Sequence, residues 1–205
     1  PGASIVCTGF DRPNLHFAVQ RTRDKDRSLL EFLRKHDKQC GVIYCATRSK
    51  VESVTQQLQR HGFKALRYHA GLTPEERRNN QNAFVGGLVP LIVATNAFGM
   101  GIDKADVRFV VHYNMPKDIE SYYQEAGRAG RDGLESECLL LYDKADIAVN
   151  TYLIGHDQPD LAWKAHEMEL LQKMTFYCNT SGCLRRVLLE YFGEKAPAKC
   201  NHCGN

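Results

Sequence analysis

The sequence predicts an α/β fold in which a doubly wound parallel sheet is covered by helices on both faces. Short apolar runs, such as residues 41–45 and 107–112, alternate along the chain with segments of helical periodicity. Strands buried on both faces are expected to be such continuous apolar runs. With 43% hydrophobic and 25% charged residues, the composition is that of an ordinary globular protein. No apolar run approaches the length of a membrane span.

The elements follow in order along the chain. Leu15, Phe17 and Val19 alternate with His16 and Ala18, which is typical of a short edge strand. Strands are predicted at residues 15–19, 41–45, 64–69, 89–94, 107–112 and 136–142. Helices are predicted at residues 25–37, between 49 and 62, from 73 onward, at 118–126, from 161 through 174 and at 181–192.

Two helix starts carry clear capping signals. Thr73 is predicted to cap the third helix, Pro74 suits its first position, and Glu76 completes a capping box. Ser181 is predicted to cap the last helix. A polar break at residues 155–160 predicts a boundary between one domain at 1–154 and a smaller helical one at 155–205.

Ligands of such sheets gather at the carboxyl ends of the strands. This rule places residues 47–49, 69–72, 95–103 and 113–116 along one edge. Residues 93–103 form a strand and a glycine-containing turn that ends in Asp103. No third glycine opens a helix after this turn, as a dinucleotide-binding fingerprint would require, so a dinucleotide site is not expected.

Residues 122–133, called here the arginine stretch, read Tyr-Tyr-Gln-Glu-Ala-Gly-Arg-Ala-Gly-Arg-Asp-Gly. Each glycine in a helix interior costs about 1 kcal/mol against alanine, so this stretch is poorly suited to an ordinary helix. Arginine presents a planar fork of donors that matches phosphate oxygens. Arg128 and Arg131, each directly after a glycine, therefore suggest a polyphosphate clamp, although a glycine-terminated helix end would also fit.

The motifs together resemble those of the RecQ family of superfamily 2 DNA helicases. Residues 94–103 with 107–112 resemble motif V, and residues 121–133 resemble motif VI. Residues 11–14, 43–45 with Arg48, and 68–72 match the same family, so the resemblance covers nearly the whole chain. It implies a second RecA-like lobe that supplies arginine fingers across an interlobe cleft.

The resemblance also implies roles for single residues. Arg131 would approach the γ-phosphate of ATP with Arg128 as its partner, Gln124 would sense the nucleotide, and Gly101 and Asp103 would lie at the ribose. The positions that resemble DNA-backbone contacts are Thr47, Ser49, His69, Gly71 and Thr95. Considered without the family, these five residues also fit ordinary turn and cap chemistry. The family further implies Mg²⁺, 3′-to-5′ polarity, single-stranded DNA or duplex with a 3′ overhang, and work in repair and recombination.

The cysteines near the end of the chain predict a metal site. Cys183 is followed by a Cys-x-x-Cys pair at Cys200 and Cys203, as in the RecQ zinc-binding subdomain, whose fourth cysteine would come one position after Asn205. Cys178 or His202 could replace that fourth Zn²⁺ ligand. Eight cysteines in a chain of 205 residues indicate a reducing compartment, so an intracellular, DNA-associated location is expected.

No Gly-x-x-x-x-Gly-Lys-[Ser/Thr] phosphate loop occurs in the sequence. We therefore expect the first RecA-like lobe to supply that loop and this chain alone to be inactive. A net charge of +3 is compatible with nucleic acid without requiring it. Two alternatives stay open: a non-catalytic zinc module that binds nucleic acid or a partner protein, and a Rossmann-type small-molecule enzyme.

Overall fold

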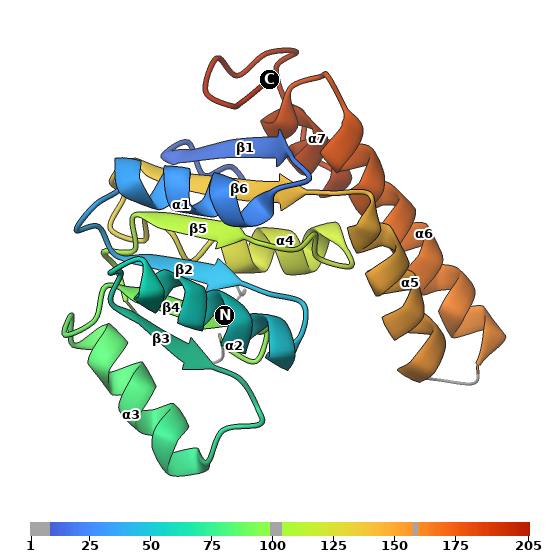
Figure 1. Cartoon of the computed structure of the whole chain (residues 1–205). Helices are drawn as coiled ribbons and strands as arrows, with labels where there is room; N and C mark the ends of the chain where they lie inside the picture. Colours follow the sequence, from blue (N-terminus) through green and yellow to red (C-terminus); the bar gives the residue numbers. More distant parts are fainter. Residues whose placement is uncertain (1–8, 99–103, 158–159) are drawn as a thin grey trace, which may run out of the picture.

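The computed structural model describes residues 9–98, 104–157 and 160–205. Six parallel strands form one sheet in the order β1-β6-β5-β2-β4-β3. The strands are β1 (Leu15–Arg21), β2 (Gly41–Tyr44), β3 (Ala65–Tyr68), β4 (Leu91–Ala94), β5 (Phe109–His112) and β6 (Ser136–Tyr142). The helices are α1 (Lys25–Lys35), α2 (Arg48–Arg60), α3 (Pro74–Val85), α4 (Ile119–Ala126), α5 (Ala145–Asp157), α6 (Leu161–Asn179) and α7 (Leu184–Tyr191). The predicted α/β class with a helical C-terminal region is confirmed, and β1 lies at an edge as expected (Figure 1).

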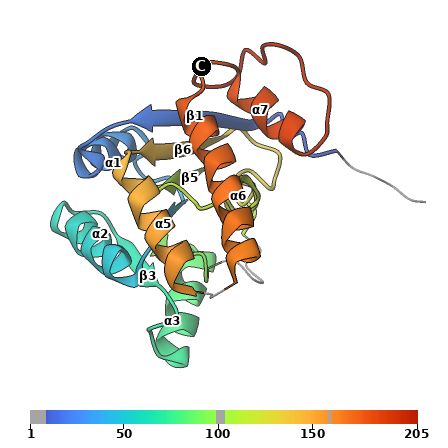
Figure 2. The same cartoon turned by 90° about the vertical axis from the view of Figure 1, so that its right-hand side faces the viewer.

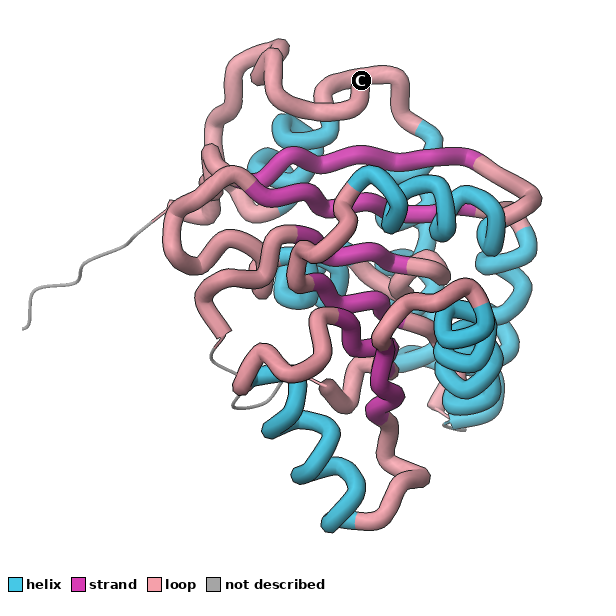
Figure 3. The backbone as a smooth tube through the Cα atoms, turned by 60° about the vertical axis from the view of Figure 1, so that its left-hand side comes forward, coloured by secondary structure: helices cyan, strands magenta, loops and turns pink. Residues whose placement is uncertain are grey.

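Alternating side chains of each strand pack into two separate cores. On one face, Ile43 of β2 packs with leucines and valines of α1 and α2. On the other face, Val42 and Tyr44 pack with apolar residues of α3, α4, α6 and α7. Figure 3 shows the strands stacked side by side with helices on either side. This two-sided burial explains why the central strands β2, β4 and β5 are continuous apolar runs in the sequence.

Helices α5 and α6 lie together at the end of the sheet where the strands finish (Figure 2). Lys25, in the first turn of α1, donates to Asp146 of α5 at 2.5 Å and to the Tyr113 carbonyl at 2.9 Å, and both charged side chains are buried. The same carboxylate accepts from the Met115 amide. A buried ion pair needs such additional hydrogen bonds to offset its desolvation. This network joins α5 to the sheet.

The helix starts agree only in part with the sequence. Thr73 accepts from the Glu76 amide at 3.1 Å, so it is the predicted cap. The Glu76 carboxylate, however, bonds to Arg67 at 2.8 Å, because that guanidinium on β3 lies within reach. Helix α7 begins at Leu184 with Cys183 at its cap position, so the prediction of Ser181 as the cap is wrong. Helix α5 was not predicted. It continues through residues 154 and 155, between which the sequence places the domain boundary, and that boundary stays a prediction. Among the described residues, no helix is both long and apolar enough to cross a membrane.

Candidate functional sites: the arginine stretch and the cysteine cluster

Helix α4 ends at Ala126, and residues 127–133, called here the arginine turn, follow it. The Gly130 amide donates to the Val107 carbonyl at 2.9 Å, just before β5. Gly130 has φ +57°, and a Cβ there would lie 2.7 Å from the Leu134 carbonyl oxygen. Only glycine adopts this backbone conformation in this space without strain. The glycines of the arginine stretch therefore shape a turn, as its composition suggested.

Side chains from two other segments hold the arginine turn. Arg12 donates to the carbonyls of Ala129 at 3.2 Å and Gly130 at 2.9 Å. Asn14 donates to the Gly130 carbonyl at 2.8 Å. Arg108 donates to both carboxylate oxygens of Asp132, at 2.7 and 2.6 Å. Both bonds come from Nη2 of Arg108, and such charge-assisted hydrogen bonds are stronger than those between neutral groups.

The Arg128 side chain lies beside the Tyr44 hydroxyl at the end of β2. Burial raises the pKa of Tyr44, and the charge and hydrogen bond of Arg128 oppose that rise, with a weaker contribution from Arg131. The same hydroxyl donates to the Phe98 carbonyl at 2.9 Å. Tyr44 thus connects Arg128 to the turn that follows β4. Arg131 is exposed, which a group that reaches a separate partner requires.

A buried acid and a buried imidazole lie next to the same tyrosine. Glu125 and His112 are 2.9 Å apart, and they are 8% and 0% exposed. His112 stacks on Tyr44 with ring centroids 5.5 Å apart. Because Glu125 is the last residue but one of α4, this pair fixes the end of that helix against β5 and β2. Gln124, the predicted nucleotide sensor, is exposed on α4.

The predicted DNA-contact residues lie where β2, β3 and β4 end. Thr47 caps α2 by accepting from the Lys50 amide at 3.2 Å, and Ser49 is exposed in the first turn of that helix. Thr95 is buried, and its amide donates to the Tyr68 carbonyl at 3.2 Å. The structure thus brings these residues to the carboxyl ends of three neighbouring strands.

His69 and Gly71 form a tight turn after β3. His69 is 5% exposed, its Nε2 lies 2.8 Å from a Glu52 carboxylate oxygen, and its Nδ1 accepts from the Gly71 amide at 3.1 Å. Both ring nitrogens are therefore occupied, and this imidazole would have to give up one hydrogen bond to contact DNA. Gly101 and Asp103, predicted at the ribose, lie outside the described residues.

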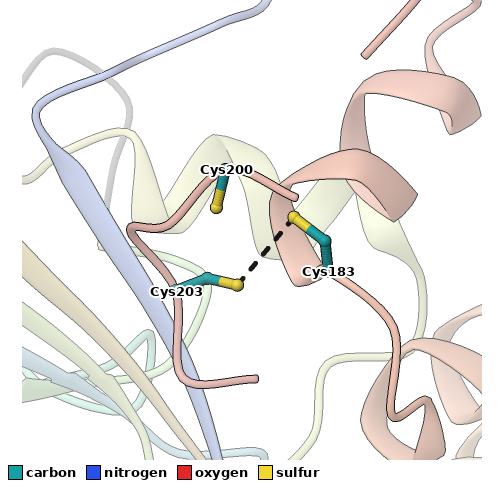
Figure 4. Close-up of side chains that lie close together, drawn as sticks. All are labelled: Cys183, Cys200 and Cys203. Atoms are coloured by element: carbon teal, nitrogen blue, oxygen red, sulfur yellow. Dashed lines mark hydrogen bonds between the residues drawn. The ribbon is translucent and has the colours of Figure 1, made fainter. Parts of the chain in front are cut away.

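Three cysteines from two segments converge near α7. Cys183 precedes α7, Cys200 and Cys203 come from the last loop, and their sulfurs all lie within 4.8 Å of one another (Figure 4). The Cys183 and Cys203 sulfurs are 3.9 Å apart. A tetrahedral zinc with Zn–S bonds of about 2.3 Å separates its sulfurs by about 3.8 Å, so the cluster fits zinc.

The thiols of this cluster shift one another's pKa. Burial raises the pKa of Cys203, but hydrogen bonds from the backbone at Asn205 and Leu184 and from the two neighbouring thiols hold it below its ordinary value. The pKa of Cys200 shifts the other way, because burial and its hydrogen bonds to Cys183 and Cys203 raise it. Among the described residues, Cys178 is not part of the cluster: it is 1% exposed in the core. His202 turns toward Glu135, 3.1 Å away.

Sequence reasoning did not find the roles of Tyr44, Arg12 or Arg185. Arg12 belongs to a family motif, yet nothing in residues 11–14 indicates which carbonyls it contacts. Those carbonyls lie more than 110 residues away along the chain. Only the helical phase of α7 offered a signal for Arg185, because Leu188 and Leu189 follow it at three- and four-residue spacing.

Comparison with known proteins identifies both parts of the chain. Residues 24–133 match the helicase conserved C-terminal domain, and residues 144–205 match the RecQ zinc-binding domain. A protein of Bacillus subtilis described as ATP-dependent DNA helicase RecQ is 46% identical over 202 residues, which are 98% of this chain and 34% of that protein. A protein of Pasteurella multocida with the same description is 42% identical over 97% of this chain and 31% of its own length.

A eukaryotic relative shows the same match. The ATP-dependent DNA helicase hus2/rqh1 of Schizosaccharomyces pombe is 41% identical over 91% of this chain and 14% of its own length. The chain thus spans about a third of the bacterial relatives, and the two family matches include the arginine stretch and the cysteine cluster. The chain belongs to the RecQ family of helicases, and it carries a RecA-like helicase C-terminal domain followed by the family's zinc-binding domain.

Proposed function

We propose that this chain is the second motor lobe and zinc-binding part of an ATP-dependent DNA helicase with 3′-to-5′ polarity. The observation that carries the proposal is the arginine turn, which is fixed by three polar side chains while Arg131 stays exposed. A fixed backbone with an exposed guanidinium suits a group that acts on a ligand held by another lobe. We also propose the domain division that the sequence suggests, with a motor lobe at residues 1–154 and a zinc-binding subdomain at 155–205.

Arg131 is the proposed arginine finger, and Arg128 is its partner. Transfer of the γ-phosphoryl group spreads negative charge over the γ oxygens, and a finger supplied across an interface accelerates the reaction by about 10³–10⁵. Gln124, four residues before Arg128 in the chain and exposed on α4, is the proposed nucleotide sensor. Gly101 and Asp103 are the proposed contacts with the ribose. The first lobe would supply the phosphate loop and the Mg²⁺ carboxylate, so this chain alone should not hydrolyse ATP.

The residues at the ends of β2, β3 and β4 are the proposed DNA-backbone contacts. Thr47, Ser49, His69, Gly71 and Thr95 lie along this edge. Contacts to phosphate grip DNA without reading its sequence, and their affinity falls steeply with salt. The proposed substrate is single-stranded DNA or duplex with a 3′ overhang, in repair and recombination of intracellular DNA.

The finger assignment is tested in the helicase that contains this chain together with its first lobe. We expect Arg131→Ala to lower the kcat of DNA-stimulated ATP hydrolysis by about 10³-fold or more while DNA affinity stays within about twofold. Lys38→Ala, on the surface turn after α1, is the control. Unchanged ATP turnover in Arg131→Ala would refute the assignment.

A non-catalytic zinc module remains the second candidate, and the mild positive charge and the cysteine cluster are what favour it. It gives no account of an arginine turn held at three places. If the helicase containing this chain bound DNA but hydrolysed no ATP, this second candidate would replace the first.

A further inference from the structure

Residues 9–14, called here the N-terminal segment, lie between the arginine turn and the zinc-binding part of the chain. On one side, Arg12 and Asn14 contact the arginine turn. On the other side, Arg185 of α7 contacts the same segment. Two regions that are more than 50 residues apart in sequence are thus connected through a third.

The contacts on the arginine side reach the backbone of the turn itself. The Arg12 guanidinium donates to Ala129 at 3.2 Å, Gly130 at 2.9 Å and, more weakly, Gly127 at 3.5 Å. Asn14 donates to the carbonyls of Gly130 at 2.8 Å and Leu134 at 2.9 Å. These carbonyls belong to residues that flank Arg128 and Arg131 in the sequence. Arg12 and Asn14 therefore fix the backbone from which both arginine side chains extend.

The contacts on the α7 side fix the N-terminal segment. Arg185 is 6% exposed and donates to the Asp11 carboxylate at 2.5 Å, the Arg12 carbonyl at 2.8 Å and the Leu15 carbonyl at 2.5 Å. A buried guanidinium with this many partners is costly to remove, because its acceptors are then left unpaired. Phe10 stacks on Phe192 just after α7, with ring centroids 4.5 Å apart. The segment therefore contacts α7 on one side and the arginine turn on the other.

We propose that Arg12 and Arg185 are positioning residues for the arginine fingers, and that α7 sets the geometry of the nucleotide-facing turn through the N-terminal segment. The inference rests on the proposed function, since it takes Arg131 to be the finger. Small misplacements of a catalytic group cost large factors in rate. Because the finger stabilises charge that develops only in the transition state, a misplaced finger lowers kcat and leaves the KM for ATP unchanged.

The test compares matched variants of the helicase that contains this chain. We expect Arg12→Ala and Arg185→Met each to lower the kcat of ATP hydrolysis by about 10- to 100-fold, with the KM for ATP within about twofold. Arg186→Met is the control, because Arg186 is the exposed neighbour and, within the described part of the chain, bonds only to Glu190 on its own helix. Its kcat should stay within about twofold of the parent. A control that loses kcat as strongly as Arg185→Met would refute the inference.

A double-mutant cycle separates positioning from general destabilisation. In a background that carries both Arg128→Ala and Arg131→Ala, Arg12→Ala should lower kcat by less than about threefold, because both groups it positions are gone. Amide hydrogen exchange of Gly130 and Asp132 should speed up in both Arg12→Ala and Arg185→Met, with exchange in β2 and β5 unchanged. If Arg185→Met does not fold, Arg12→Ala and its cycle decide the inference alone.

The outcomes also distinguish this inference from the proposed function. If Arg131→Ala abolishes turnover but Arg12→Ala has no effect, or acts equally in both backgrounds, the positioning role is refuted and the finger stands. If Arg131→Ala leaves turnover unchanged, the finger assignment fails and the positioning role fails with it.

Discussion

Gly130 offers the sharpest test of the geometry of the arginine turn. The residue has φ +57°, and a Cβ built on it would lie 2.4 Å from Asn14 Nδ2 and 2.7 Å from the Leu134 carbonyl oxygen. Gly133, three residues later, has φ +81° with no atom within 4 Å of its Cβ position. The two glycines thus share the backbone requirement and differ in the space around them, so Gly133→Ala is a matched control for Gly130→Ala.

The expected losses of stability follow from the backbone conformation of each glycine and from the space around it. A left-handed conformation costs a residue with a Cβ about 1–2 kcal/mol, and this applies to both variants. At Gly130 the clash also displaces Asn14 from its two carbonyl partners, and each lost hydrogen bond costs about 0.5–1.5 kcal/mol. We therefore expect Gly130→Ala to lower the free energy of unfolding by about 2–5 kcal/mol, and Gly133→Ala by about 1–2 kcal/mol.

Urea unfolding of both variants, followed by circular dichroism, measures this difference. The midpoint should fall further for Gly130→Ala, with the same dependence on urea for both proteins. Equal destabilisation of the two variants would show that Asn14 and the Leu134 carbonyl do not confine the turn. The contacts that fix Arg128 and Arg131 would then be wrong.

Three further predictions concern the buried pair, the cysteines and pH. Asp146→Asn should lower the free energy of unfolding by about 3–5 kcal/mol in a urea titration, because it leaves the Lys25 ammonium buried without its carboxylate partner. Glu31→Gln removes one partner of the exposed Arg27–Glu31 pair and should change nothing measurable in the same titration. Cys200→Ser should reduce bound zinc to well below one equivalent in a colorimetric chelator assay, whereas Cys40→Ser should leave it unchanged. Burial raises the pKa of Cys138 to about 12, so stability should decline as pH rises from about 9 toward 12, and Cys138→Ala should make that decline shallower in urea titrations at successive pH values.

The buried strands were predictable from the sequence because their consecutive residues are apolar. The central strands β2, β4 and β5 are buried on both faces, so residues such as Val42 and Ile43 are apolar side by side. The missing element, α5, has a different kind of buried face. Its buried positions are Asp146, Asn150 and Ile154, four residues apart. Two of these three are polar and bond to the loop after β5, so a search for apolar periodicity finds no stripe there.

The chemistry of the arginine stretch was predictable, but its surroundings were not. The glycines indicate a turn and the arginines indicate a phosphate-binding group, because both follow from properties of the residues themselves. Which carbonyl each neighbour contacts depends on how β1 and α4 pack, and the partners lie more than 110 residues apart. His69 shows the same limit, because its Nε2 is occupied by Glu52 of α2, which lies 17 residues earlier in the chain.

Arg185 and Arg186 show what decides between two identical neighbours. In the sequence they are a basic pair in an amphipathic helix, and either could be a solvated charge. In α7, Arg185 lies on the side of Leu188 and Leu189 and is 6% exposed, whereas Arg186 pairs with Glu190 along the surface. Burying a charge on the apolar side of a helix costs free energy unless hydrogen-bond acceptors lie within its reach. The N-terminal segment supplies those acceptors, so the burial of Arg185 itself argues that α7 and the arginine turn adopt their positions together.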